Sequence, residues 1–433
     1  MRRVNPWHLA RAIVAALSLG AVVRSADAQA IALVGGTVYP VSGPKIERGT
    51  VVLRDGRVVA VGRDVAIPAD ARRIDVTGRV VTPGFVNAGT QLGVVEIGAV
   101  RDTRDASARG RDAIAAAFAV WEGFNPASEL IQPARNEGVT TAIVVPNGGL
   151  VSGQAAVVHL DGRTASDALL RPSAAMVAQV GDARSAAVGA RGELIGRLRE
   201  LLVDARAYGR SRAAYERNQT RTYTASRADL EALQPVLAGR LPMLVAADRA
   251  ADIDAALRLR REFGFRLMIL GGAEAWELAD RLAADRVPVV TGAMNNIPAD
   301  FASLGQRQEN AALLTNAGVP VALIGNAGGG DEESFNVRNV RFEAGNAVAY
   351  GMRYDAALRA VTLTPAELFG VADRVGSLAP GRDADVVVWS GDPFEFATRA
   401  EHVFIRGREV TGDSRQDELA RRYRTLPPAY TTP

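Results

Sequence analysis

Through the middle of the chain, short apolar runs alternate with amphipathic segments. Compact apolar runs of buried-strand length occur at residues 140–145, 174–180, 241–245, 265–270, 287–290 and 319–324. Ala275, Leu278, Ala279 and Leu282 repeat at the i, i+3, i+4 and i+7 spacing of one helical face. Gly318 follows another helical segment, where a left-handed C-terminal cap is expected. Strand–helix alternation over this length predicts a parallel sheet.

With residues 80–86 and 155–159 included, about eight strands alternate with helices, which predicts an α/β fold with a closed (β/α)8 TIM barrel. An open doubly wound sheet is the alternative that the pattern leaves open. Residues 364–367, Thr-Pro-Ala-Glu, match a capping box with proline at the first helical position. They are predicted to begin the last helix of this region.

Both ends of the chain have a strand-rich pattern instead. Residues 51–53 and 58–61 flank an Arg-Asp-Gly-Arg turn, which is typical of a β-hairpin, and short apolar strands recur at residues 384–389 and 403–405. We therefore predict a small split β-sandwich domain formed from both chain ends. The predicted boundaries are 31–82 and 374–412 for its two parts, 83–373 for the barrel and 413–433 for a polar C-terminal tail.

The first thirty residues match a signal peptide. Arginines at positions 2, 3 and 11 give a positively charged start before an apolar run at residues 12–23. Ala28-Gln29-Ala30 then has the small-x-small form of a cleavage site. The run is too short to span a bilayer. A buried first helix is the alternative. We expect an exported, periplasmic or extracellular protein with no membrane association after cleavage.

Removing that segment changes the charge balance. Four of the 51 basic residues and one of the 48 acidic residues lie in it, which leaves 47 of each. A neutral protein gives no electrostatic reason to expect a nucleic-acid partner. The chain has no cysteine, one lysine (Lys45, in the predicted β domain) and, beyond residue 30, only His159 and His402. Both histidines are predicted to be structural.

Three stretches resemble the amidohydrolase superfamily, most closely its imidazolonepropionase-like branch. They are residues 80–87, Val-Val-Thr-Pro-Gly-Phe-Val-Asn; residues 271–276, Gly-Gly-Ala-Glu-Ala-Trp; and residues 364–385, which end in Gly-Ser-Leu-Ala-Pro-Gly-Arg-Asp-Ala-Asp. The resemblance extends over residues 31–412. It implies a TIM barrel with a split β-sandwich, and hydrolysis of C–N bonds other than peptide bonds, such as those of cyclic amides.

In that family, one or two divalent metals, such as zinc, activate water. The ligands are a His-x-His pair after strand one, histidines after strands five and six, and an aspartate after strand eight. Here the first two positions fall on Gly89 and Gln91, the strand-five position near Ala246, the strand-six position on Gly271, and the strand-eight position on Asn326 or Ala327. Glycine and alanine carry no donor atom, whereas a zinc site needs several converging donors. The resemblance therefore implies degenerate metal positions, and we predict neither a metal nor another cofactor.

Other polar residues are predicted at the C-terminal ends of the barrel strands, where TIM barrels place their active sites. Asp248 and Glu274 are the candidate catalytic pair, because two carboxylates with different pKa values can carry out hydrolysis without metal. Alternatively, Asp248–Arg249 is a charge pair at a helix start and Glu274 an acid favoured by a helix dipole. Further pocket candidates are Asn87, Glu96, Arg249 and Asn295.

Three functions follow. The first is a pseudo-hydrolase that binds a small cyclic amide-like ligand, or that pairs in a homo- or hetero-dimer with an amidohydrolase homologue. The second is an active, metal-independent hydrolase of C–N bonds that uses Asp248 and Glu274. The third is a metallohydrolase with unusual oxygen ligands around Gln91 and Asn326, a donor set that is weak for zinc.

Overall fold

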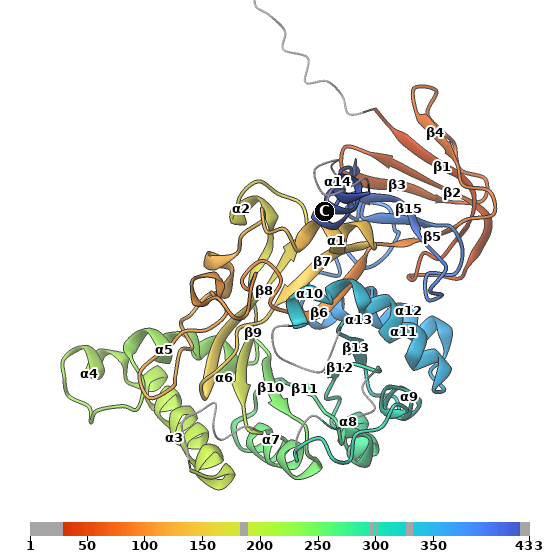
Figure 1. Cartoon of the computed structure of the whole chain (residues 1–433). Coiled ribbons are helices and arrows are strands. Elements are labelled where there is room, and N and C mark those ends of the chain that lie inside the picture. The colour runs from red at the N-terminus through yellow and green to blue at the C-terminus, as the bar shows by residue number, and fades with distance from the viewer. Residues whose placement is uncertain (1–28, 182–188, 295–297, 299–300, 326–331, 425–433) are drawn as a thin grey trace, which may run out of the picture.

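The computed structural model describes residues 29–181, 189–294, 298, 301–325 and 332–424. Its strands form two sheets of eight strands each. One sheet belongs to a β domain at the upper right of Figure 1, and the other forms the barrel below it, with helices packed around its outside. Within the described ranges, the helices are too short or too polar to cross a membrane.

The β domain unites the two ends of the chain in one hydrogen-bonded sheet. Its strand order is β16-β15-β14-β5-β1-β2-β3, and β4 pairs with β1. The N-terminal strands are β1 (Ile31–Val38), β2 (Ile46–Arg54), β3 (Arg57–Gly62), β4 (Arg72–Asp75) and β5 (Val80–Pro83); the C-terminal strands are β14 (Val386–Trp389), β15 (Ala400–Ile405) and β16 (Arg408–Glu409). The β2–β3 hairpin turns at Asp55 and Gly56, both with positive φ, as the Asp-Gly pattern predicts. Because β14 pairs with β5, the two ends complete one domain.

The barrel sheet runs in the order β13-β12-β11-β10-β9-β8-β7-β6. Its strands are β6 (Phe85–Thr90), β7 (Val139–Val144), β8 (Val151–His159), β9 (Leu169–Gln179), β10 (Met243–Ala247), β11 (Leu267–Gly271), β12 (Val289–Thr291) and β13 (Val321–Leu323). The two outer strands approach each other: an ideal Cβ on Gly89 would lie 3.2 Å from Ile324 Cγ2. The predicted TIM-barrel class is confirmed, as a nearly closed barrel.

One strand departs from the predicted parallel arrangement. β8 runs antiparallel to both β7 and β9. Only residues 145–150 connect β7 to β8, and among them Gly148 and Gly149 have positive φ. A parallel pair needs a crossover of a dozen or more residues, so these short connections force hairpins. The prediction that residues 155–159 form a parallel barrel strand was therefore wrong in direction.

Alternate residues of the barrel strands face two different cores. Leu244, Met268 and Val290 belong to a cluster inside the barrel, whereas Met243 and Ile269 belong to the larger cluster between the strands and the helices. This period of two is the expected consequence of strand geometry. The barrel interior is therefore a packed apolar core, and function is left to the strand ends.

The helices cover the outside of the barrel and connect its strands. They are α1 (Ile131–Asn136), α2 (Ala165–Ala168), α3 (Arg191–Arg210), α4 (Arg212–Glu216), α5 (Arg227–Ala232), α6 (Gln234–Leu237), α7 (Ala250–Phe263), α8 (Ala279–Ala284), α9 (Asn310–Asn316), α10 (Glu332–Phe335), α11 (Val340–Ala349), α12 (Tyr354–Ala360), α13 (Leu363–Leu368) and α14 (Arg415–Tyr423). The predicted apolar face at residues 275–282 packs against the core, but its first turn is the 3-10 helix η4 (Ala275–Leu278). Gly318, with φ of 90°, follows α9 as predicted.

The predicted capping box at Thr364 is wrong. Helix α13 begins at Leu363, so Thr364 lies inside it, and the N-cap residue Thr362 makes no side-chain cap. The Thr362 hydroxyl donates instead to the carbonyl of Leu358 at 2.6 Å, and so closes the preceding helix α12. The segment predicted as a C-terminal tail contains helix α14, which begins with its own capping box at Ser414.

Candidate functional site

The first predicted metal position lies in an apolar environment. An ideal Cβ on Gly89 would lie 3.2 Å from Ile324 Cγ2 and 3.8 Å from both Leu270 Cδ1 and Val145 Cγ2. These three side chains belong to the barrel-interior cluster or pack against it. The apolar core therefore extends to the strand end at which the family places its first histidine, and a larger side chain here would displace Ile324.

The amide of Asn87 secures the end of β6. Asn87 is fully buried; its Oδ1 accepts the N–H of Gly89 at 3.1 Å, and its Nδ2 donates to the Val337 carbonyl at 3.3 Å. Gln91 is also buried, and its backbone carbonyl accepts the N–H groups of Val94 and Val95 in the turn that follows. These contacts give Asn87 a structural role at the mouth.

Glu96 lies further along the segment after β6. Its Oε1 accepts a hydrogen bond from Asn125 Nδ2 at 2.7 Å. This contact joins two parts of the long connection between β6 and β7. Glu96 is partly exposed, so the bond stabilises that connection at the surface.

The fifth and sixth strand ends are adjacent. Ala246 of β10 pairs with Leu270 of β11, and Ala247 pairs with Gly271. Gly271 has φ of 89°, a conformation that favours glycine. An ideal Cβ at position 271 would lie only 2.5 Å from Asp248 Oδ1. The space beside the predicted sixth-strand ligand position is thus filled by the carboxylate of Asp248.

Asp248 and Glu274 are adjacent through their backbones, and both side chains accept backbone hydrogen bonds. Asp248 Oδ1 accepts the Ala273 N–H at 3.3 Å, and the backbone carbonyl of Asp248 accepts the Glu274 N–H at 2.8 Å. Glu274 Oε2 accepts the N–H of Ala250, the first residue of α7, at 2.9 Å, and its Oε1 accepts the Gly305 N–H at 3.2 Å. Glu274 therefore caps the helix after the neighbouring strand and holds residue 305 against it.

Two buried acids near the mouth were not found from the sequence. Asp252, in the first turn of α7, contacts Arg191 at 3.3 Å, and Arg249 at the N-cap lies nearby. Burial raises the pKa of the Asp252 carboxyl, although Arg249 and Arg191 oppose the shift. Glu343 of α11 is fully buried, and its Oε2 accepts the N–H groups of residues 293 and 294 after β12. An acid within the buried face of a helix is the signal that would have identified both.

The residues at three of the predicted metal positions, Gly89, Ala246 and Gly271, offer no ligand to a metal ion. Position 89 is enclosed by aliphatic groups, Ala246 has no donor atom, and any side chain at position 271 would meet Asp248. Among the residues that the structure describes, no three His, Asp or Glu side chains converge closely enough to hold a metal. The two remaining candidates, Asn295 and Asn326, lie outside the described residues.

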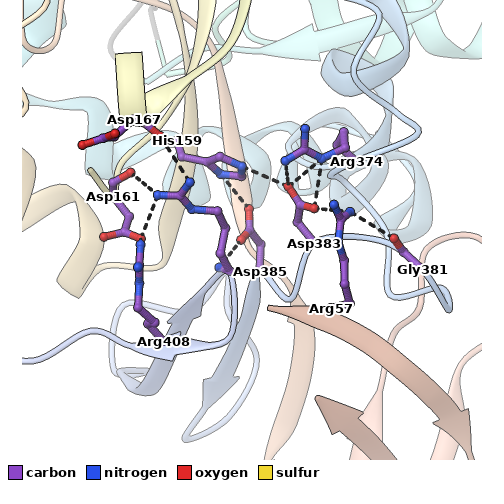
Figure 2. Close-up of polar contacts among 10 residues, drawn as sticks. Arg57, His159, Asp161, Asp167, Arg374, Gly381, Asp383, Asp385 and Arg408 are labelled. Carbon is purple, nitrogen blue, oxygen red and sulfur yellow. Dashed lines mark hydrogen bonds and ion pairs between the residues drawn. The ribbon is translucent and has the colours of Figure 1, made fainter. Parts of the chain in front are cut away.

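The principal buried charge cluster lies between the barrel and the β domain (Figure 2). His159, at the end of β8, is 1% exposed; its Nε2 is 3.1 Å from Asp383 Oδ2, and its Nδ1 is 3.3 Å from Asp385 Oδ2. Asp383 also contacts Arg57 of β3 at 2.5 Å and Arg374 at 2.7 Å. The structural role predicted for His159 fits this placement.

The cluster favours charged side chains despite its burial. Burial lowers the pKa of His159, but the carboxylates of Asp385 and Asp383 outweigh that effect and raise it above its usual range. Burial raises the pKa of the Asp383 carboxyl, but hydrogen bonds from His159 and Arg374 outweigh it and bring the pKa to about 2. The raised pKa favours the protonated imidazole, which lies between the two carboxylates and links the two domains.

His402 lies elsewhere in the β domain. Its Nδ1 is 2.6 Å from Glu409 Oε1, across the β15–β16 hairpin, and the pair is partly exposed. It lies on a different strand from the barrel-mouth residues, as the predicted structural role requires.

Comparison with known proteins identifies the family. A model of the amidohydrolase family matches residues 260–410. The crystal structure of an amidohydrolase from Thermotoga maritima MSB8 superimposes with a TM-score of 0.79 at 29% identity, covering 88% of this chain and all of that one. The chain belongs to the amidohydrolase superfamily. Its TIM barrel and second sheet domain are those of the superfamily's solved structures.

Curated amidohydrolase relatives match over different lengths. The amidohydrolase tasK of Hapsidospora irregularis is 25% identical over 395 residues, covering 84% of this chain and 39% of its own. The imidazolonepropionase of Erwinia tasmaniensis is 31% identical over 173 residues, covering 36% of this chain and 39% of its own. The chain thus spans about two fifths of each of these relatives. Molinate hydrolase, at 20% identity and a TM-score of 0.57, shares the fold.

Proposed function

We propose that this amidohydrolase-superfamily protein is exported and works as a pseudo-hydrolase, which binds a ligand or a partner and does not perform metal-dependent hydrolysis. The observation that carries the proposal is the structure around the degenerate ligand positions. Gly89 is surrounded by Ile324, Leu270 and Val145, and the Asp248 carboxylate occupies the space that a side chain at position 271 would need. These positions are filled by other side chains, so restoring histidines would require the mouth to repack.

The test is the metal content of the mature protein, purified without chelator and without a histidine tag. We expect zinc, manganese and iron far below one equivalent, also after soaking in each metal and removing the excess. One equivalent of bound metal would contradict the proposal. Hydrolysis of cyclic amides and imidates, assayed with and without chelator, gives the second readout; turnover that chelation abolishes would contradict the proposal equally.

The proposed ligand is a small cyclic amide-like molecule, the substrate class of the superfamily, and the proposed partner is a second copy or an active homologue. Co-purification from the native host, followed by mass spectrometry, should recover an amidohydrolase homologue. Export is supported by the position of β1, which begins at Ile31 directly after the proposed cleavage site; N-terminal sequencing of the secreted form tests it.

The second candidate function is metal-independent hydrolysis, favoured by the adjacency of Asp248 and Glu274 at the strand ends. It requires chelator-resistant turnover that Asp248→Asn or Glu274→Gln abolishes. Glu277→Gln is the matched control, because Glu277 is an exposed acid of the adjacent 3-10 helix. Turnover that survives both mouth substitutions would exclude this pair as the catalytic groups.

A further inference from the structure

A second candidate site lies on the flank of the barrel, formed by the connection between α4 and α5. This connection and α4 project from the molecule at the left of Figure 1. A hollow of about 360 Å³ opens there, lined by the segment that contains Tyr215, Arg221 and Tyr223 and by Arg111 from the connection after β6. This volume is in the range of small-molecule sites.

The two arginines of the hollow are held in place from behind. Arg221 forms an ion pair with the fully buried carboxylate of Asp204 and donates to the Thr222 carbonyl at 3.1 Å. Its guanidinium also lies over the ring of Tyr223, 5.2 Å from the centroid. Arg111 donates through Nη2 to the Tyr223 carbonyl at 2.8 Å. Both guanidinium groups are therefore positioned before any ligand arrives, which lowers the entropic cost of binding.

The charge of the hollow is positive. The described residues that line it include two arginines and no acid, and Asn218, Thr220 and Thr222 add neutral polar groups. Asp204 neutralises Arg221 from below, because its carboxylate is buried and also accepts the Thr224 N–H at 2.8 Å. The Arg111 guanidinium is about half exposed, and its ion-pair partner Asp112 is 3.9 Å away, so its charge faces the hollow with little compensation.

Two stacked tyrosines line the hollow. Tyr215 and Tyr223 are stacked with parallel planes, their centroids 5.7 Å apart, and Tyr208 meets Tyr215 edge to face at 5.1 Å. Tyr223 is buried, whereas Tyr215 is partly exposed. A planar group bound beside Arg111 can pack against the partly exposed ring of Tyr215 while its negative end receives guanidinium hydrogen bonds.

We propose that this hollow binds a small ligand that carries an oxyanion, a carboxylate or a phosphate, which the guanidinium groups of Arg111 and Arg221 receive. Guanidinium matches both anions because its N–H groups form a planar fork. None of the candidate residues of the barrel mouth that the structure describes lines the hollow, so the proposal does not depend on whether the mouth binds or hydrolyses anything.

Calorimetric titration of the full mature chain tests the site with three probes. Benzoate offers a ring and a carboxylate, benzamide offers the same shape without charge, and inorganic phosphate offers the anion alone. We expect benzoate or phosphate to bind, and benzamide not to bind. Benzoate as the tighter probe would identify an aromatic carboxylate as the ligand class; phosphate as the tighter probe would identify a phosphate group.

Two variants decide whether the hollow is responsible. Arg111→Gln should weaken anion binding by about ten- to a hundredfold, the effect of losing a charge-assisted hydrogen bond. Arg217→Gln removes an exposed arginine of the same connection that does not line the hollow, and it should leave binding within about twofold. Failure of both anions to bind, equal binding of benzamide, or equal losses in the two variants would overturn the proposal.

Discussion

Asp248 and Gly271 share one space at the barrel mouth: the Oδ1 atom of Asp248 is 2.5 Å from the position that a Cβ at residue 271 would take. Their strands are neighbours, since Ala247 pairs with Gly271. The glycine and the carboxylate therefore depend on each other. A side chain at position 271 requires Asp248 to move, and the backbone there, at φ of 89°, already favours glycine.

Gly271→Ala should lower the free energy of unfolding by about 1–3 kcal/mol, because it combines a strained backbone conformation with a steric conflict. Asp248→Ala in the same chain should recover part of this loss, since only the strain then remains. Chemical denaturation of the two single variants and the double variant measures the coupling. Additive losses would show that the carboxylate does not restrict position 271.

Gly89→His should destabilise the protein by about 1–3 kcal/mol and should create no metal site, because the new side chain meets Ile324 in a packed core. Denaturation midpoints with and without zinc measure both effects. Gly196→Ala in helix α3 is the matched control: its Cβ would meet nothing within 4 Å, and it should be neutral or stabilising. Zinc-dependent stabilisation of Gly89→His would contradict the apolar mouth.

Glu274→Ala should leave the N–H groups of Ala250 and Gly305 without their acceptor. We expect a loss of about 1–3 kcal/mol and faster hydrogen exchange at these two amides. Glu274→Gln keeps one carbonyl acceptor and should lose less. Glu277→Ala, at an exposed acid nearby, should change neither quantity; protection that is unchanged in Glu274→Ala would show that the cap does not hold α7.

His159→Gln should cost about 1.5–3 kcal/mol at low pH, where the imidazolium binds two carboxylates. The pKa of His159 is raised in the folded protein, so its contribution is complete below the ordinary pKa of 6.5 and is lost as the pH rises through the folded value. The difference in unfolding free energy between wild type and variant should therefore shrink at alkaline pH. His402→Gln, in a partly exposed pair, should have a smaller effect.

In the same cluster, the stabilising contribution of Asp383 changes with pH in the opposite direction to that of His159. The pKa of Asp383 is lowered to about 2, so its stabilising contribution is complete above the ordinary value of 3.8 and is lost as the pH falls through the folded one. Asp383→Asn should remove stability at neutral pH and little at pH 2. Urea titrations at several pH values check this, and a loss that is constant with pH would contradict it.

The sequence predicted those parts of the fold that depend on local pattern. The Asp55-Gly56 turn, the apolar strand runs and the face of Ala275 and Leu282 all follow from neighbouring residues. The direction of β8 was missed, although six connecting residues are too few for a crossover. The cap at Thr364 was misplaced: α13 begins one residue earlier, at Leu363, and the hydroxyl of its N-cap residue Thr362 donates to Leu358 of the previous helix.

The site could be predicted only as a set of positions. Asp248 and Glu274 were named as two carboxylates expected at the strand ends, and the backbone carbonyl of Asp248 accepts the N–H of Glu274 at 2.8 Å. The Asp248 carboxylate fills the space beside Gly271. This contact depends on how far the two strands are shifted along each other, which the spacing of residues in the sequence does not reveal. The carboxylate partners of His159 lie 224 or more positions away in the sequence. The residues around His159 therefore predict a strand but do not reveal its charged partners.

The junction of β5 and β14 affects the order in which the chain can fold. Trp389 Nε1 donates to Thr82 Oγ1 across 307 positions of sequence, so the N-terminal sheet has no partner until almost the whole chain has been synthesised. Closing such a distant pair is slow, because chain entropy is lost before the contact stabilises anything. During synthesis, the edge of β5 therefore stays unpaired until β14 has been made.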